Sequence, residues 1–181
     1  MQLSINEQQQ QEMCHAYYDG APGILVSSLV WMAAALVCYQ LGINQAVWTL
    51  LIGGAFIYPI SLIVTKALGR AAQTSKANAL NQLGMASTIW LILCCAMAYG
   101  LFLLKPGLFF PAMMASIGSR YLVFASLYGK SVYWVMGGSL ILAANLVFFL
   151  ALTPVAVAGL GGLIELLFAV LVFSKASKLA Q

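Results

Sequence analysis

Charged side chains are scarce in this sequence. Only 7% of its 181 residues are Asp, Glu, Lys or Arg, and it holds four acids and a single histidine. So few of these residues exclude paired-carboxylate proteases, H-E-x-x-H zinc enzymes and multi-histidine haem sites. The four cysteines form no C-x-x-C motif, and no phosphate-binding loop occurs. We therefore expect neither an enzyme nor an ATP-driven motor, and no cofactor or metal.

Most of the sequence consists of long apolar segments. The chain is 63% hydrophobic with a mean hydropathy of +0.97, whereas a soluble domain carries about 25% charged residues. About 20 apolar residues suffice to cross a bilayer as a helix. The sequence predicts an all-α, polytopic membrane helix bundle of six transmembrane helices at residues 24–41, 45–66, 82–104, 108–128, 132–152 and 155–173. This transmembrane domain would cover residues 23–175, between a polar N-terminal segment (1–22) and a basic C-terminal tail (176–181).

The polar N-terminal segment contains a helix start. Residues 4–7 read Ser-Ile-Asn-Glu, which fits a capping box. Met13, Ala16 and Tyr17 would share one face of this helix, and we expect that face to lie on the membrane surface. The other polar stretch, at residues 66–81, is compatible with a helical extension of the second span.

The basic residues predict an orientation. Six spans put both termini on one side of the membrane. That side would carry Lys66, Arg70, Lys76, Lys130, Lys175 and Lys178, and the other side would carry only Lys105. Because Lys and Arg are enriched in cytoplasmic loops, we predict that both termini are cytoplasmic.

Two charges fall inside the predicted spans, Arg120 and Glu165. A central Arg costs ~2.5 to 3.5 kcal/mol on insertion scales, and the apolar residues of its span return roughly 2.4 to 4.8 kcal/mol. This span therefore inserts with little margin and needs a partner for its guanidinium. Glu165 is the only acid in another span, at a similar depth, so we predict an Arg120–Glu165 pair. Ser116 and Gly161, four residues before each charge, would let the two helices approach.

The predicted pair has two interpretations. In the functional one, Arg120 and Glu165 form a polar binding site with Ser116, and Asn145 supports Arg120. In the structural one, the same residues only fix helix packing. The small or helix-breaking residues of the spans are likewise either packing sites or hinges; they are Gly53, Gly54, Pro59 and Gly161.

Short motifs recur between the two halves of the chain. Residues 22–23 and 106–107 are both Pro-Gly, and each pair precedes a span. Residues 53–54 and 137–138 are both Gly-Gly, at the same offset in the second and fifth spans. A unit of three spans that repeats once must be inverted, and inverted repeats are a recurring plan of transporters. We retain a 3+3 inverted repeat as a hypothesis, since few other identities support it.

The chain as a whole resembles small six-span bacterial integral membrane proteins of unknown function. The resemblance rests on Gly20-x-Pro22-Gly23, Trp31, Gly53-Gly54, Tyr58-Pro59 and Gly69-Arg70. It implies a bacterial inner-membrane location. Two functions stay open: a small transporter or permeation pathway for a small molecule or ion, and a membrane protein that acts through packing or partner binding. A homo-oligomer is compatible with both, and nothing indicates binding of nucleic acid.

Overall fold

The chain folds into helices, as its composition predicts. The computed structural model describes residues 4–150 and 152–178, except for the side chains of residues 148, 177 and 178. The elements are α1 (Ile5–Tyr17), η1 (Tyr18–Gly20), α2 (Ala21–Leu41), α3 (Ile43–Ala67), α4 (Leu80–Leu104), η2 (Pro106–Leu108), α5 (Phe109–Tyr128), α6 (Val132–Phe149) and α7 (Pro154–Lys178). The prediction of an all-α bundle of six long helices is confirmed.

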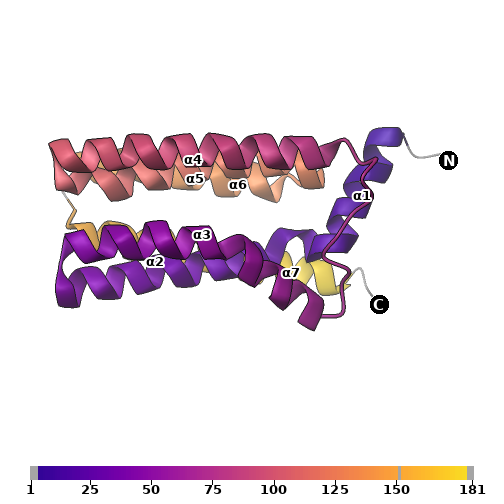
Figure 1. Cartoon of the computed structure of the whole chain (residues 1–181), viewed down its shortest axis with the longest axis horizontal. Helices are drawn as coiled ribbons and strands as arrows, with labels where there is room; N and C mark the ends of the chain where they lie inside the picture. The colour runs from indigo at the N-terminus through magenta and orange to yellow at the C-terminus, as the bar shows by residue number, and fades with distance from the viewer. Residues whose placement is uncertain (1–3, 151, 179–181) are drawn as a thin grey trace.

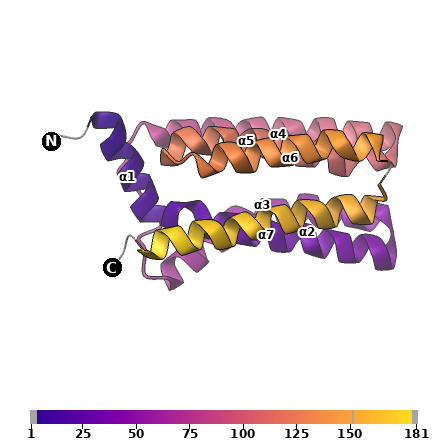
Figure 2. The same ribbon diagram turned by 180° about the vertical axis from the view of Figure 1, so that it is seen from behind.

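The six long helices form two layers (Figures 1 and 2). In one layer, α2 packs between α3 and α7. In the other layer, α5 packs between α4 and α6. We call these the α2 layer and the α5 layer. Since α1 and the end of α7 lie at the same end of the bundle, we call this end the α1 end.

The long helices fit a lipid bilayer. Four of them, α3, α4, α5 and α7, are each long and apolar enough to cross a membrane, and so is the continuous helical stretch that contains α2. The apolar helix α6 is shorter over its described residues. Large apolar side chains cover the outer faces of α3 and α4, among them Phe56, Ile63 and Met97. A face of this kind suits lipid tails.

Glycine brings the central helix of each layer close to a neighbour. A Cβ placed on Gly53 of α3 would lie 2.7 Å from Cγ1 of Val30 on α2. A Cβ on Gly137 of α6 would lie 2.6 Å from the carbonyl oxygen of Gly118 on α5. Both contacts are too short for any larger residue, so both helix pairs depend on the missing side chain.

The remaining residues predicted as packing sites or hinges behave differently from one another. A Cβ on Gly161 would lie 3.2 Å from the Trp31 ring, so this glycine serves packing between α7 and α2. Gly54 and Gly138 each have open space within 4 Å. Pro59 lies inside the continuous helix α3, which bends outward toward its C-terminal end (Figure 1).

The polar segments depart from the sequence prediction in two ways. The capping box between Ser4 and Glu7 is present, but Met13 and Ala16 are buried in the protein at 4% and 3% exposure. The linker does not extend α3 as a helix, because α3 ends at Ala67 and α4 begins at Leu80. Instead, Glu12 of α1 accepts hydrogen bonds from the backbone N–H of Ser75 (2.5 Å) and from Nδ2 of Asn78 (2.8 Å). The linker is thereby fastened to α1.

The predicted span boundaries shift by a few residues. The first helix begins at Ala21 instead of residue 24, because Pro22 occupies its first turn, where proline is tolerated. The fifth helix ends at Phe149, before residue 152, and the last extends to Lys178, beyond residue 173.

Candidate functional site

Glu165 lies between the two layers at mid-length of α7, and it is fully buried at 0% exposure. The hydroxyl of Tyr121, on α5, donates to its Oε1 at 3.0 Å. This hydrogen bond therefore joins the α2 layer to the α5 layer. Ser27 of α2 is close enough to interact with the carboxyl and with Tyr121. Within the described part of the chain, Oε2 still has no hydrogen-bond partner.

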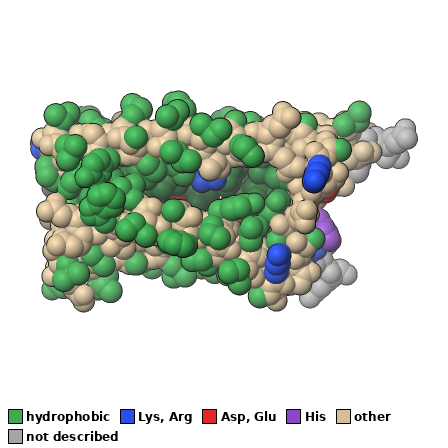
Figure 3. All heavy atoms as spheres, viewed as in Figure 1, with side chains coloured by type: hydrophobic (Ala, Val, Ile, Leu, Met, Phe, Trp, Pro, Cys, Tyr) green, Lys and Arg blue, Asp and Glu red, His purple; other side chains and the backbone are tan. Residues whose placement is uncertain are grey.

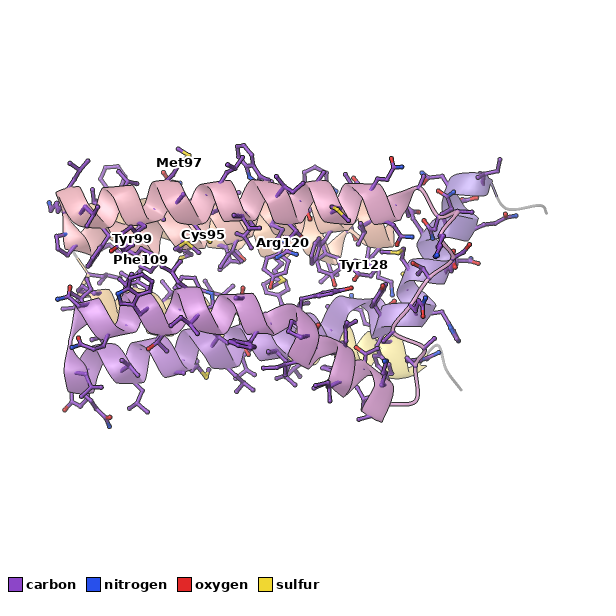
Figure 4. All side chains as sticks on the ribbon, in the orientation of Figure 1. Cys95, Met97, Tyr99, Phe109, Arg120 and Tyr128 are labelled. Atoms are coloured by element: carbon purple, nitrogen blue, oxygen red, sulfur yellow. The ribbon has the colours of Figure 1, made fainter. Side chains whose placement is uncertain are left out.

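Arg120 belongs to the α5 layer and points into the space between the layers (Figure 4). Its side chain is half-buried, and one terminal nitrogen donates to the hydroxyl of Thr88 on α4 at 3.2 Å. Its Cζ lies 5.2 Å from the centre of the Phe124 ring, which is within cation–π range. Its Nε is buried and has no hydrogen-bond partner among the described residues.

The direct ion pair that the sequence predicts between Arg120 and Glu165 is not formed. Among the described residues, the one ion pair joins Lys130 and Asp19. Neighbouring residues of an α-helix point about 100° apart. Tyr121 therefore faces α7 and occupies the position beside the carboxyl, while Arg120 faces α4. The two charges lie on the same boundary between the layers and interact electrostatically without touching.

Two further predicted site residues lie elsewhere. Asn145 is exposed, and its Nδ2 donates to the carbonyl oxygen of Ile141 in its own helix at 2.7 Å. It makes no hydrogen bond to Arg120, because its side chain is exposed and its described hydrogen bond stays within α6. Ser116 donates to the carbonyl oxygen of Ala112, also in its own helix, at 2.7 Å. Polar side chains in helices commonly make such local bonds, and the side-chain hydrogen bonds of both residues go to their own helices instead of to Arg120 or Glu165.

A groove separates the layers on the face formed by α3 and α4. Figure 3 shows this hollow, lined mainly with hydrophobic side chains and with a basic side chain inside it. Figure 4 places Arg120 there and shows Cys95, Tyr99 and Tyr128 directed into the same space, whereas Met97 points away from it. We call this hollow the inter-layer groove.

Aromatic rings connect the layers at the end opposite α1. Trp48 of α3 lies 5.6 Å from Tyr99 of α4, measured between ring centres. Trp31 of α2 lies 6.0 Å from Phe110 of α5 by the same measure. Both contacts join one layer to the other.

Polar contacts connect the layers at the α1 end. Asp19 of η1 pairs with Lys130 of the α5–α6 turn at 2.5 Å, and its carbonyl oxygen accepts a hydrogen bond from the Tyr133 hydroxyl. The next residue, Gly20, has a φ of +82°, and a Cβ there would lie 2.6 Å from the Tyr133 hydroxyl oxygen. Glycine is required for both reasons. Because α1 also packs on α4 and α5 before the chain enters α2, it spans both layers.

Sequence reasoning missed Tyr121, Thr88 and the Asp19–Lys130 pair. Tyr121 looks like one of several aromatics in an apolar span, and only the packing of α5 on α7 gives its hydroxyl a partner. Asp19 and Gly20 are typical turn residues, and they take left-handed backbone angles here. A turn pattern does not show that Asp19 meets Lys130, which is distant in the sequence. The described residues contain no group of three or more His, Cys, Asp or Glu that could hold a metal ion.

Comparison with known proteins identifies a family whose function is unknown. Residues 6–175 match the model of a family of unknown function, DUF7010. No curated protein and no solved structure matches the chain. The expected resemblance to a family of unknown function is confirmed, and any function must come from the residues themselves.

Proposed function

This chain belongs to the DUF7010 family of unknown function, and we propose that it is a non-enzymatic transport protein that moves a small solute between its two layers. The observation that carries the proposal is the hydrogen bond from Tyr121 to Glu165. It joins the layers in the middle of the bundle, beside an arginine that faces the inter-layer groove.

The unsatisfied atoms support a functional site over a purely structural one. A buried charged group is costly unless it is paired and its atoms are hydrogen-bonded. Here Nε of Arg120 and Oε2 of Glu165 both lack partners in the described chain. Ionisable groups inside a membrane are costly, and they commonly mark substrate or ion pathways. The arrangement is therefore better explained as a site that a solute completes.

The contacts at the two ends of the groove suggest how such a site would open. The Trp48–Tyr99 contact joins the layers at one end, and the Asp19–Lys130 pair joins them at the α1 end. In this proposal the two contacts act as the closures. Alternating access requires that one closure break while the other holds. Neither closure involves Arg120 or Glu165, so the layers can separate at either end around a fixed site.

The packing order fits the inverted repeat. If α2, α3 and α4 correspond to α5, α6 and α7, the repeat predicts that α7 packs on α2 as α4 packs on α5, and both pairs are in contact. The glycines agree, because Gly53 and Gly137 are close-packed while Gly54 and Gly138 are open. Transport sites commonly lie between such halves near the membrane midplane.

The proposed location is the bacterial cytoplasmic membrane, with both termini in the cytoplasm. The basic residues of the α1 end support this orientation, since only Lys105 lies in a turn at the other end.

Action through a protein partner is the competing function. In this function the polar stretch at residues 66–81 would contact the partner, but Glu12 holds Ser75 and Asn78 of this stretch against α1. Nothing in the described residues adds a specific contact for a partner or for a second copy.

Accessibility of Cys95 tests the transport proposal. We would keep Cys95 as the only cysteine, by replacing Cys14, Cys38 and Cys94 with Ser, and add an anionic, membrane-impermeant methanethiosulfonate to vesicles of either orientation. Because Cys95 points into the inter-layer groove, we expect it to be modified in both orientations.

The matched control is Met97→Cys in a background without other cysteines, since Met97 lies on the same helix and points away from the groove. We expect Cys95 to react several-fold faster than this control. If both cysteines are equally inert from both sides, the layers enclose no water path, and the packing or partner-binding function remains.

A further inference from the structure

The membrane-embedded charges of this protein balance. In the long helices, away from their ends, the sequence carries one cation, Arg120, and one anion, Glu165. Both lie on the boundary between the layers, and no direct ion pair joins them. Each can therefore gain a ligand or a proton without first breaking a salt bridge. The net charge of this region is zero in the empty protein when both groups are ionised.

Arg120 offers the features of an anion site. One terminal nitrogen of its guanidinium donates a hydrogen bond to the neutral hydroxyl of Thr88, and its Nε has no partner among the described residues. Around it are the Phe124 ring, Tyr121, Tyr128 and, on α4, Cys95. Guanidinium groups bind planar oxyanions with two parallel hydrogen bonds, and the aromatic walls suit a small apolar body. Adding one monoanion there would leave the region with one uncompensated negative charge.

Glu165 can remove this excess charge by taking a proton. Its Oε1 accepts from Tyr121, and its Oε2 is free to carry the proton. The titratable or charged groups that interact with it are Tyr121 and Arg120, both on α5, and the polar group from α2 is Ser27. Protonation takes one proton from water and returns it to water on the other side. No other bond forms or breaks.

We infer that the site binds one small monoanion at Arg120 together with one proton at Glu165, so that transport is electroneutral. This inference rests on the proposed function and names its substrate class. The empty site and the fully loaded site are then both neutral, whereas a site with only the anion or only the proton carries a net charge. Because a net charge is costly in a bilayer, the half-loaded states are disfavoured, and this couples the anion to the proton.

Binding measurements in detergent test the coupling. The probes are sodium nitrate and sodium L-lactate, two monoanions that fit a guanidinium, with sodium sulfate as the divalent comparison. Stabilisation against thermal unfolding gives the apparent affinity at each pH. If one proton binds with each anion, the affinity for at least one monoanion rises about tenfold for each unit that the pH falls, in the range where Glu165 of the empty protein is ionised. Sulfate should bind more weakly.

The variants separate the two parts of the site. Glu165→Gln should bind the same monoanion with an affinity that no longer depends on pH, and Arg120→Gln should not bind it. Should Arg120→Gln fail to fold, Arg120→Lys keeps the charge without the planar fork, and it should bind more weakly with the pH slope intact. Lys105→Gln, which changes a cation outside the site, should behave as the unmodified protein.

Two results would overturn the inference. One is binding of nitrate or lactate to the unmodified protein with the same pH-independent affinity as to Glu165→Gln. The other is the absence of stabilisation by either probe at every pH. Failure of the proposed function is seen separately, as a Cys95 that reacts no faster than Met97→Cys.

Discussion

Tyr121 is the side chain through which the two layers share a hydrogen bond in the middle of the bundle. Among the described residues, only its hydroxyl donates a hydrogen bond to the Glu165 carboxyl. Removal of a partner from a buried polar group costs ~1 to 3 kcal/mol. Tyr121→Phe should therefore lower the free energy of unfolding in detergent by about this amount. Glu165→Gln should cost less, because its amide oxygen can still accept from Tyr121.

The control for this change is Tyr39→Phe, which removes a hydroxyl from a side chain that is 78% exposed. Equal stability of the Tyr121→Phe and Tyr39→Phe proteins would show that the bond between the layers contributes nothing.

Cys14 of α1 provides a pH-dependent prediction outside the membrane spans. Its Sγ donates to the carbonyl oxygen of Tyr128 at 3.2 Å. Burial, reinforced by the nearby Asp19 carboxylate, raises the pKa of the Cys14 thiol to about 12. Only the thiolate is reactive, so a protein with Cys14 as its only cysteine should react slowly with iodoacetamide at neutral and mildly alkaline pH.

In denaturant, the same thiol should titrate near ~8.5, the value of a free cysteine. The measurement is the alkylation rate against pH, with and without denaturant. A folded protein whose Cys14 titrates at the ordinary value would mean that α1 does not dock on the end of α5.

At this scale the sequence located the charges but not their partners. Arg120 and Glu165 stand out because every other residue near them is uncharged, and their equal depth follows from counting. Which face each side chain takes depends on how α5 rotates against α4 and α7. This rotation cannot be read from one sequence. The contacts of Tyr121 with Glu165 and of Thr88 with Arg120 could therefore not be predicted.

Gly137 controls how closely α5 and α6 approach. Since its Cβ would meet the backbone oxygen of Gly118 at 2.6 Å, Gly137→Ala must push the helices apart. Overpacking of this kind costs ~1 to 3 kcal/mol. We expect that loss in the free energy of unfolding, measured in detergent.

Gly138→Ala is the matched control, one residue further along the same helix and with open space around its Cβ. Alanine is favoured over glycine in a helix by roughly 0.5 to 1 kcal/mol, so this change should be neutral or stabilising. If Gly138→Ala were the more damaging of the two, the assigned contact between α5 and α6 would be wrong.

The helices themselves were predictable, because apolar runs of this length have one common solution in a bilayer. The Gly-Gly pairs were recognisable as packing sites, but which glycine of each pair makes the contact was not. The linker was misjudged because its interaction with α1 depends on Glu12 and Asn78, which are far apart in the sequence.

At the scale of the whole molecule, we predict that the α1 end faces the cytoplasm. Reporter fusions that distinguish cytoplasm from exterior should place the N-terminal segment, the linker at residues 68–79 and the C-terminus inside. The reason is the concentration of Lys and Arg at that end. A C-terminal fusion that reports an exterior position would change the number of spans and remove the equal depth of Arg120 and Glu165.

The two layers explain how a small bundle could hold a solute. Most close contacts lie within a layer, and the layers meet through a few aromatic and polar groups. Interfaces of this kind can open at one end while they stay closed at the other. The central claim is that the layers move relative to each other as two bodies.

Pulsed electron spin resonance distances between the layers test this claim most directly. Spin labels at Leu41 and Leu104 would report the end opposite α1, and labels at Ala67 and Gln82 the α1 end. A pair within the α2 layer, Leu41 on α2 with Ala156 on α7, is the control. We predict two populations of the label-to-label distance at each end. Conditions that favour the longer distance at one end should favour the shorter distance at the other. The control pair should show one population. A single narrow distribution at both ends, unchanged by pH or by nitrate, would contradict the account.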